Sequence, residues 1–182
     1  MIFDAQIYSK IFEEKYHDTT FVSIGSCNEI EDIENQSVKL VSNILKASKI
    51  IKFVDRDDKS NAEVAELLTK GIKTLDKRHI ENYLLDDEII KKLCIAQGQE
   101  DKIDACLIAK QDAIKDSIEN RHNPTDDIKS ASGKIYTELK RILSLRQCGN
   151  NTISFLRDTM APLITDETEI YKDLERQIFG TK

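Results

Sequence analysis

The amino-acid sequence predicts an α/β fold, in which a small parallel β-sheet is followed by an α-helical C-terminal region. Helix and strand patterns alternate over residues 5–75, as in folds that place helices on the faces of a parallel sheet. Strand patterns end near residue 86, and only helical periodicity follows. The 182 residues include only 2 Pro and 6 Gly, too few for the many tight turns of a β-sandwich or barrel. We therefore expect two parts, an α/β domain over 1–90 and a helical extension over 91–182.

The first part contains helix and strand patterns in pairs, over residues 5–16 and 19–24, 35–47 and 49–54, and 61–70 and 72–75. The predicted helices place apolar residues three and four positions apart. The predicted strands are short apolar or β-branched runs, of which KIIKFV is the clearest. Gly71 is expected to end the third helix. Folds of this type usually begin with a strand, whereas this chain begins with a helix.

The second part contains helical patterns around residue 90 and over 101–119, 134–146, 152–160 and 167–178. Pro124 indicates a loop before the third of these helices, and Gly149 indicates a break before the fourth. We expect this region to pack as helices without a sheet of its own.

The composition is that of a globular protein with a charged surface. Apolar residues make up 40% and charged residues 33%, which excludes wholesale disorder. The net charge of −6 argues against a DNA-binding protein held by electrostatics alone. No apolar run approaches the ~20 residues of a membrane helix, and the first residues lack the pattern of a signal peptide. We therefore expect a cytoplasmic protein without a membrane partner.

The cysteines are widely spaced, at positions Cys27, Cys94, Cys106 and Cys148. Zinc sites require ligands at short, regular spacing, so no zinc site is expected. The histidines are equally scattered, which leaves a Ser-His or Cys-His nucleophile unsupported. Reduced, partly buried thiols are the better interpretation.

The first candidate site follows the strand at 49–54, where the sequence is Asp55-Arg56-Asp57. In an extended chain residues i and i+2 point the same way, so the two aspartates would share one divalent cation. Carboxylate oxygens suit Mg²⁺ or Mn²⁺, and ligands of parallel sheets bind at the carboxyl ends of the strands. The alternative is an acidic loop before the helix at 61–70, with Ser60 or Asn61 as its N-cap.

Two further segments contain candidate residues. Glu81, after the last predicted strand, would add an acidic ligand or orient a water, unless it only stabilises a helix N-terminus. Gly133 precedes Lys134 at a predicted helix start, where an ammonium group would lie near a phosphate. No P-loop pattern is present, and a solvated surface lysine is the alternative.

Together these segments resemble the Toprim domain of overcoming-lysogenization-defect (OLD) nucleases and related ATPase–Toprim proteins of bacterial phage defence. The resemblance depends on FVDRDD, which ends the strand at 49–54, followed by IENYLL at 80–85. It covers about residues 1–90 as Toprim, and the helical remainder resembles the C-terminal extension of some of these proteins. The resemblance implies a DNA endonuclease that uses Mg²⁺ or Mn²⁺.

The resemblance also implies roles for particular residues. The metal ligands would be Asp4, Asp55, Asp57 and Glu81. Glu81 and Lys134 would be the catalytic residues, and the lysine would offset charge on the transition state. In such a site two metal ions activate a water and stabilise the leaving oxygen.

The sequence departs from the family pattern at its start. The first Toprim strand and its glutamate would lie before residue 1, so we expect a fragment that begins inside the Toprim fold and lacks the N-terminal ATPase domain. As such a fragment it is expected to bind metal weakly and to be inactive as a nuclease. A missing strand would leave a sheet edge open to self-association. Two alternatives stay open: a non-catalytic Toprim-like assembly module, and an α/β domain in which Asp55 accepts a phosphoryl group.

Overall fold

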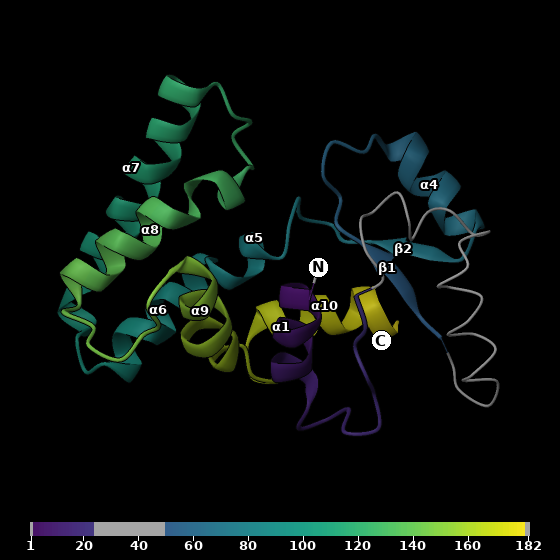
Figure 1. Ribbon diagram of the computed structural model, residues 1–182, viewed down its shortest axis with the longest axis horizontal. Helices are drawn as coiled ribbons and strands as arrows, with labels where there is room; N and C mark the ends of the chain where they lie inside the picture. The colour runs from purple at the N-terminus through teal and green to yellow at the C-terminus, as the bar shows by residue number, and fades with distance from the viewer. Residues whose placement is uncertain (1, 24–49, 181–182) are drawn as a thin grey trace.

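The computed structural model describes residues 2–23 and 50–180 (Figure 1). Within these residues the elements, in chain order, are α1 (Ile2–Phe12), β1 (Lys52–Val54), α4 (Asn61–Thr69), β2 (Ile72–Thr74), α5 (Glu81–Leu84), α6 (Asp87–Ala96), η1 (Glu100–Lys102), α7 (Ile103–Arg121), α8 (Ile128–Ile142), α9 (Thr152–Phe155), η2 (Leu156–Met160), η3 (Ala161–Leu163) and α10 (Glu169–Phe179). The fold is mixed α/β and mostly helical, with a two-stranded parallel sheet.

The sheet is formed by β1 and β2, which pair in parallel with Val54 opposite Thr74. Helix α4 connects the two strands, as the alternation of patterns predicts. Its N-terminus carries a capping box, because the Ser60 side chain accepts from the Glu63 backbone N–H and the Glu63 carboxylate accepts from the Ser60 N–H. Gly71 takes a φ of 73° directly after the helix, a conformation that glycine adopts without strain. The expected small parallel sheet is therefore present.

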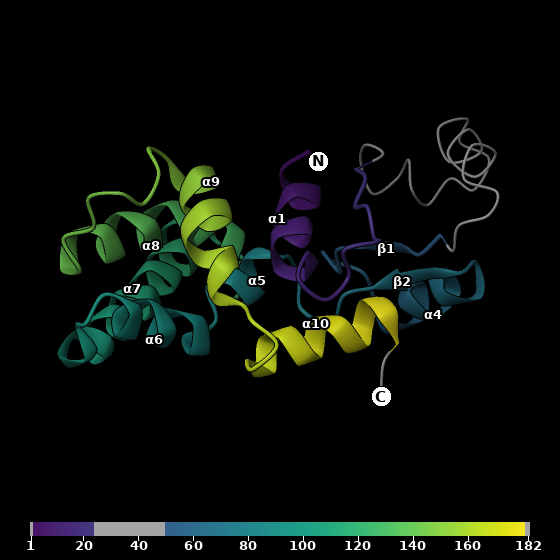
Figure 2. The same ribbon diagram turned by 90° about the horizontal axis from the view of Figure 1, so that it is seen from below.

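One hydrophobic core joins segments that are far apart in the sequence. Helices α1 and α10 lie in the middle of the molecule, between the sheet and helices α6–α9 (Figure 2). The ring of Phe12 in α1 contacts those of Tyr171 and Phe179 in α10, at centroid distances of 5.0 and 5.2 Å. Lys73 of β2 donates to the Ile178 carbonyl of α10. The core thus crosses the boundary expected near residue 90.

The helical region follows the predicted periodicity with one important shift. Helix α8 begins at Ile128, earlier than the predicted start at 134, because Asp127 caps it by accepting from the Ser130 backbone N–H. Gly133 and Lys134 therefore lie in the middle of a helix, and the prediction that they mark a helix start is wrong. In the part of the chain that the structure describes, no helix combines the length and the apolar character needed to cross a membrane.

The strand predicted over 19–24 is absent from its described residues, 19–23, which have irregular backbone. Phe21 packs its ring against Tyr8 and Phe12, at centroid distances of 5.6 and 5.9 Å. This segment is therefore held by side-chain packing, whereas a strand requires a paired backbone. Ile24, the turn after it and the helix predicted over 35–47 lie outside the described residues.

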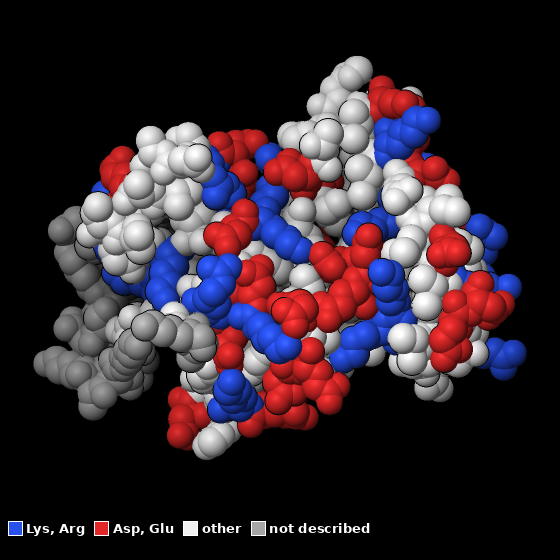
Figure 3. Space-filling model, turned by 180° about the vertical axis from the view of Figure 1, so that it is seen from behind, with Lys and Arg blue, Asp and Glu red and all other residues white. Residues whose placement is uncertain are grey.

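The described surface carries charges of both signs. Figure 3 shows acidic and basic side chains interspersed over the face seen from behind. This agrees with the mixed-charge surface that the composition predicts.

Candidate functional site

Two carboxylates of the candidate site follow the carboxyl ends of the two strands. Asp55 comes directly after Val54 of β1, and the Val54 carbonyl accepts from the Leu75 backbone N–H just beyond β2. A short turn then leads to α5, which begins at Glu81. A third carboxylate, Asp4, lies in the first turn of α1. The fold thus places residues from three separate segments at one end of the parallel sheet, where such sheets bind ligands.

The pKa of Asp55 responds to the other three predicted ligands. Burial raises the pKa of Asp55 to about 7, and the charges of Asp4, Glu81 and Asp57 add to this rise. Lys129 acts in the opposite direction. We call Asp4, Asp55, Asp57 and Glu81 the acidic group. The metal site implied by the resemblance thus consists of Asp55 and three carboxylates whose charges act on it.

Glu81 is the most deeply buried member of the acidic group. Its side chain is 5% exposed, and burial raises its pKa. Its Oε2 atom is buried without a hydrogen-bond partner. A buried carboxylate oxygen without a partner is costly, so this position suits a bound cation or water.

Asp57 lies at a turn. Its φ of 46° falls in the left-handed region, which is strained for a residue with a side chain. The turn is held by a 3.0 Å hydrogen bond from the Asp57 backbone N–H to the Arg78 carbonyl. One carboxylate oxygen lies 3.1 Å from Nε2 of His79 and the other 3.4 Å from Nζ of Lys59. The extended Asp55-x-Asp57 geometry that we expected is therefore not retained, although both aspartates stay in the acidic group.

Lys129 is the lysine whose pKa responds to all four members of the acidic group. Burial lowers the pKa of Lys129, but Glu81, Asp55, Asp4 and Asp57 together raise it above its ordinary value. Lys134 lies elsewhere on α8, where its Nζ is 3.3 Å from Asp116 of α7. The lysine role that the resemblance implies therefore fits Lys129 better than Lys134.

The sequence itself carries a sign that Lys129 lies at a helix start. Asp127 stands three residues before Ser130, and apolar residues follow at helical spacing. That pattern is typical of a helix that begins at Ile128, with Lys129 in its first turn. The contacts of His79 with the acidic group carry no local sequence sign, because they join segments distant in the chain.

The acidic group fits a divalent cation in donor type and charge. Hard carboxylate oxygens are the ligands that Mg²⁺ and Mn²⁺ prefer, and a bound cation would relieve the repulsion between Asp55 and the other carboxylates. In the described ranges, however, no three acidic, histidine or cysteine side chains converge closely enough to hold one ion. The carboxylates would have to move closer together on binding.

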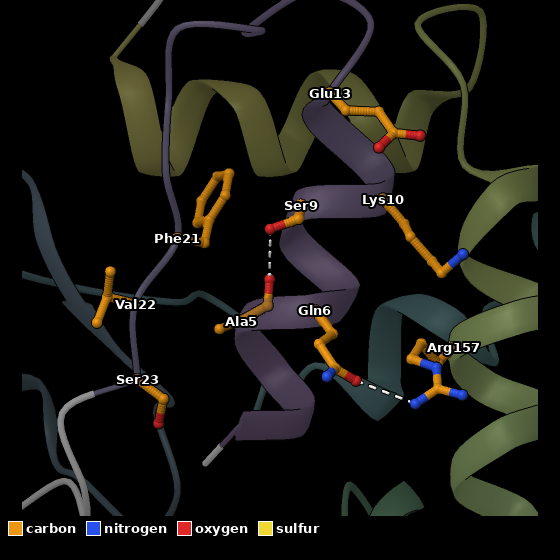
Figure 4. Close-up of a pocket in the computed structure, with 9 residues that line it drawn as sticks. All are labelled: Ala5, Gln6, Ser9, Lys10, Glu13, Phe21, Val22, Ser23 and Arg157. Carbon is orange, nitrogen blue, oxygen red and sulfur yellow. Dashed lines mark hydrogen bonds between the residues drawn. The ribbon is translucent and has the colours of Figure 1, made fainter.

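A separate groove of about 640 Å³ runs along the outer face of α1 (Figure 4). It is bordered by α1, by the segment 21–23 and by Arg157 of η2, which donates to Gln6 across 3.0 Å. None of the acidic group lines it. The groove is therefore distinct from the candidate site.

Comparison with protein-family models, with curated proteins and with solved structures finds no match for this chain. The function must therefore be inferred from the chemistry of its own side chains. The acidic group and Lys129 are the side chains whose arrangement bears most directly on it.

Proposed function

We propose that this chain contains the site of a metal-dependent phosphodiester hydrolase, with DNA as its substrate and Mg²⁺ or Mn²⁺ as its cofactor. One observation carries this proposal. The acidic group lies at the carboxyl end of a parallel sheet, and Lys129 lies within the electrostatic field of all four of its carboxylates. Paired carboxylates with an adjacent lysine are suited to holding cations and to stabilising a phosphoryl transition state.

The proposed role of each residue follows from its surroundings. A bound divalent cation would supply Lewis acidity and lower the pKa of a coordinated water. Asp55 and Asp57 would hold the cation, and the strongly raised pKa of Asp55 is the behaviour expected of a ligand whose counter-charge is a metal. Glu81, through its Oε2, would accept a hydrogen bond from the attacking water. Lys129 would offset the negative charge that develops on the phosphate.

The resemblance to OLD-type Toprim domains supports DNA as the substrate and phage defence as the setting. It also suggests that an ATPase domain works with this site in the complete protein. The overall charge of −6 means that a DNA phosphate must be attracted by metal ions or by local cations such as Lys129.

A calorimetric titration with Mn²⁺ tests the proposal. We expect the parent chain to bind Mn²⁺ and the Asp55→Asn/Asp57→Asn variant to lose binding. Asp101→Asn/Asp104→Asn, which removes two exposed carboxylates from η1 and α7, is the matched control and should bind like the parent. Equal binding by the parent and the Asp55/Asp57 variant would place the metal elsewhere. Plasmid nicking in Mn²⁺ then tests catalysis directly.

A non-catalytic assembly module is the second candidate. One observation favours it: in the described residues the acidic side chains do not converge on a single ion site. This candidate predicts that the parent chain binds no Mn²⁺ at millimolar concentration and does not nick DNA. The same titration therefore separates the two functions.

A further inference from the structure

His79 connects the acidic group to the start of helix α8. Its Nε2 lies 3.1 Å from Oδ1 of Asp57, and its Nδ1 lies 3.9 Å from Oδ1 of Asp127. The histidine side chain is 9% exposed, and Nδ1 is buried without a hydrogen-bond partner. The buried ring thus occupies the space between the two carboxylates, and in a close-packed interior neither carboxylate can approach the other unless the ring shifts.

Arg78 makes the same connection one residue earlier. Its Nη2 pairs with Asp58, and its Nη1 lies 3.5 Å from Asp126. The Arg78 side chain is 11% exposed, whereas both partner carboxylates are largely exposed, so the guanidinium forms the inner side of each contact. Asn82 adds a 2.8 Å hydrogen bond to the Asp126 carbonyl. Arg78 and His79 thus each lie between one aspartate of the Asp57-Asp58 pair and one of the Asp126-Asp127 pair.

The two ends of this connection carry different parts of the proposed site. Asp57 belongs to the acidic group. Asp127 is the N-cap of α8 and accepts from the Ser130 backbone N–H at 3.0 Å. Lys129 lies in the helical turn that this cap begins. A shift of Asp127 would therefore move Lys129 relative to the carboxylates.

We propose that Arg78 and His79 are positioning residues, which form a clamp that sets the separation between Asp57 and Lys129 in the proposed site. The inference rests on the proposed function. The Asp57 side of the clamp governs metal binding, and the Asp127 side governs the placement of the lysine. Residues that orient metal ligands from outside typically change metal affinity or activity by about 10–100-fold when they are replaced.

Two substitutions of His79 separate the clamp from general stability. In His79→Gln the amide nitrogen reaches about as far as Nε2, so the contact with Asp57 is retained. In His79→Asn the amide reaches only about as far as Nδ1, so that contact is lost. We expect His79→Asn to weaken Mn²⁺ binding about tenfold or more, and His79→Gln to stay within about threefold of the parent. Urea unfolding of both variants provides the stability control.

Asp127→Asn tests the other side of the clamp. Asparagine is as good an N-cap as aspartate, so α8 should remain intact while the carboxylate opposite His79 loses its charge. We expect unchanged Mn²⁺ affinity and a nicking rate at saturating Mn²⁺ that falls about tenfold. Arg78→Lys keeps the charge but cannot reach both Asp58 and Asp126, so it should lower both the Mn²⁺ affinity and the nicking rate. It provides the test of the clamp if the His79 variants do not fold.

The outcomes distinguish the two proposals. If the parent binds Mn²⁺ and nicks DNA but His79→Asn, Asp127→Asn and Arg78→Lys match it within twofold, the clamp is overturned and the proposed function stands. If His79→Gln loses as much affinity as His79→Asn, the Asp57 contact is not what matters, and the clamp is again overturned. A parent that neither binds Mn²⁺ nor nicks DNA overturns the proposed function, and the clamp with it.

Discussion

Lys129, in the first turn of α8, lies within the electrostatic field of Glu81, the first residue of α5. The two helices pack against each other although they come from different regions of the sequence. Each residue favours the charged form of the other, since Lys129 lowers the pKa of Glu81 and Glu81 raises that of Lys129. A lysine fixed beside a buried carboxylate is an arrangement able to hold a phosphate and a water next to each other.

Replacing Lys129 should impair catalysis much more than replacing Lys134. For Lys129→Met we expect the nicking rate at saturating Mn²⁺ to fall about 100-fold, because one preorganised charge on the transition state is lost. Lys134→Met removes the same charge from the same helix at a position beside Asp116 and should keep the parental rate. Conversion of supercoiled plasmid to its relaxed form measures both rates. Equal effects of the two substitutions would remove Lys129 from the site.

Asp55 should make stability depend on pH in an unusual direction. Its folded-state pKa of about 7 lies above the ordinary value of 3.8, so the folded chain holds this proton more tightly than the unfolded chain. The stabilisation is complete below about pH 4 and is lost as pH rises through about 7. Asp55→Asn should therefore be more stable than the parent at pH 8, by on the order of 2–4 kcal/mol.

Urea unfolding at pH 8 and at pH 4 measures this difference, which should disappear at the lower pH. Asp112→Asn, on the exposed side of α7, should be as stable as the parent at both pH values. Saturating Mn²⁺ should stabilise the parent and not Asp55→Asn, because only the parent retains the ligand. A variant less stable than the parent at pH 8 would contradict the environment described for Asp55.

Phe12→Ala should destabilise the whole molecule and not the N-terminal segment alone. Phe12 is fully buried and contacts aromatic rings of α10. We expect a loss of about 3–5 kcal/mol in the free energy of unfolding. Tyrosine fluorescence and far-ultraviolet circular dichroism should report one coincident transition. Ile153→Ala, at a side chain 54% exposed, should cost less than about 0.5 kcal/mol.

Two glycines provide a matched test of backbone crowding. Gly149 and Gly98 both have positive φ, at 87° and 62°. A Cβ at Gly149 would lie 2.8 Å from the Phe155 backbone nitrogen, whereas a Cβ at Gly98 would meet nothing within 4 Å. Both alanine variants incur the left-handed strain of about 1–2 kcal/mol, but Gly149→Ala should lose at least about 2 kcal/mol more. Thermal unfolding compares the stability of the two variants. Equal losses of stability would mean that the loop before α9 shifts to accommodate the added methyl group.

The features predicted correctly from the sequence are those set by neighbouring residues. The capping box of Ser60 and Glu63 and the apolar run before Asp55 are local, and α4 and β1 appear where they indicate. The strand predicted over 19–24 is absent from the described residues 19–23, because a strand depends on a pairing partner that local sequence does not specify. The start of α8 was placed too late because Asp127 follows a proline loop, which hid its role as a cap.

The candidate site divides in the same way. Asp55, Asp57 and Glu81 are indicated by their positions after predicted strands and Asp4 by the resemblance, and in the fold the other three carboxylates act electrostatically on Asp55. Lys129 was missed because the Gly133-Lys134 pair was mistaken for a helix start. The contact of His79 with Asp57 joins a loop after β2 to a loop after β1. Such a contact depends on the tertiary fold and has no counterpart in spacing or periodicity.

The packing of α1 against α10 has a consequence for biosynthesis. The rings of Phe12 and Phe179 are brought together only after nearly the whole described sequence has been translated. Until then, the part of the apolar face of α1 that packs against α10 stays uncovered, because α10 is still inside the ribosome. Closure of long chain loops is slow, and exposed apolar segments are prone to aggregate. The nascent chain must therefore wait for α10, and during that interval α1 is a segment on which a chaperone would act.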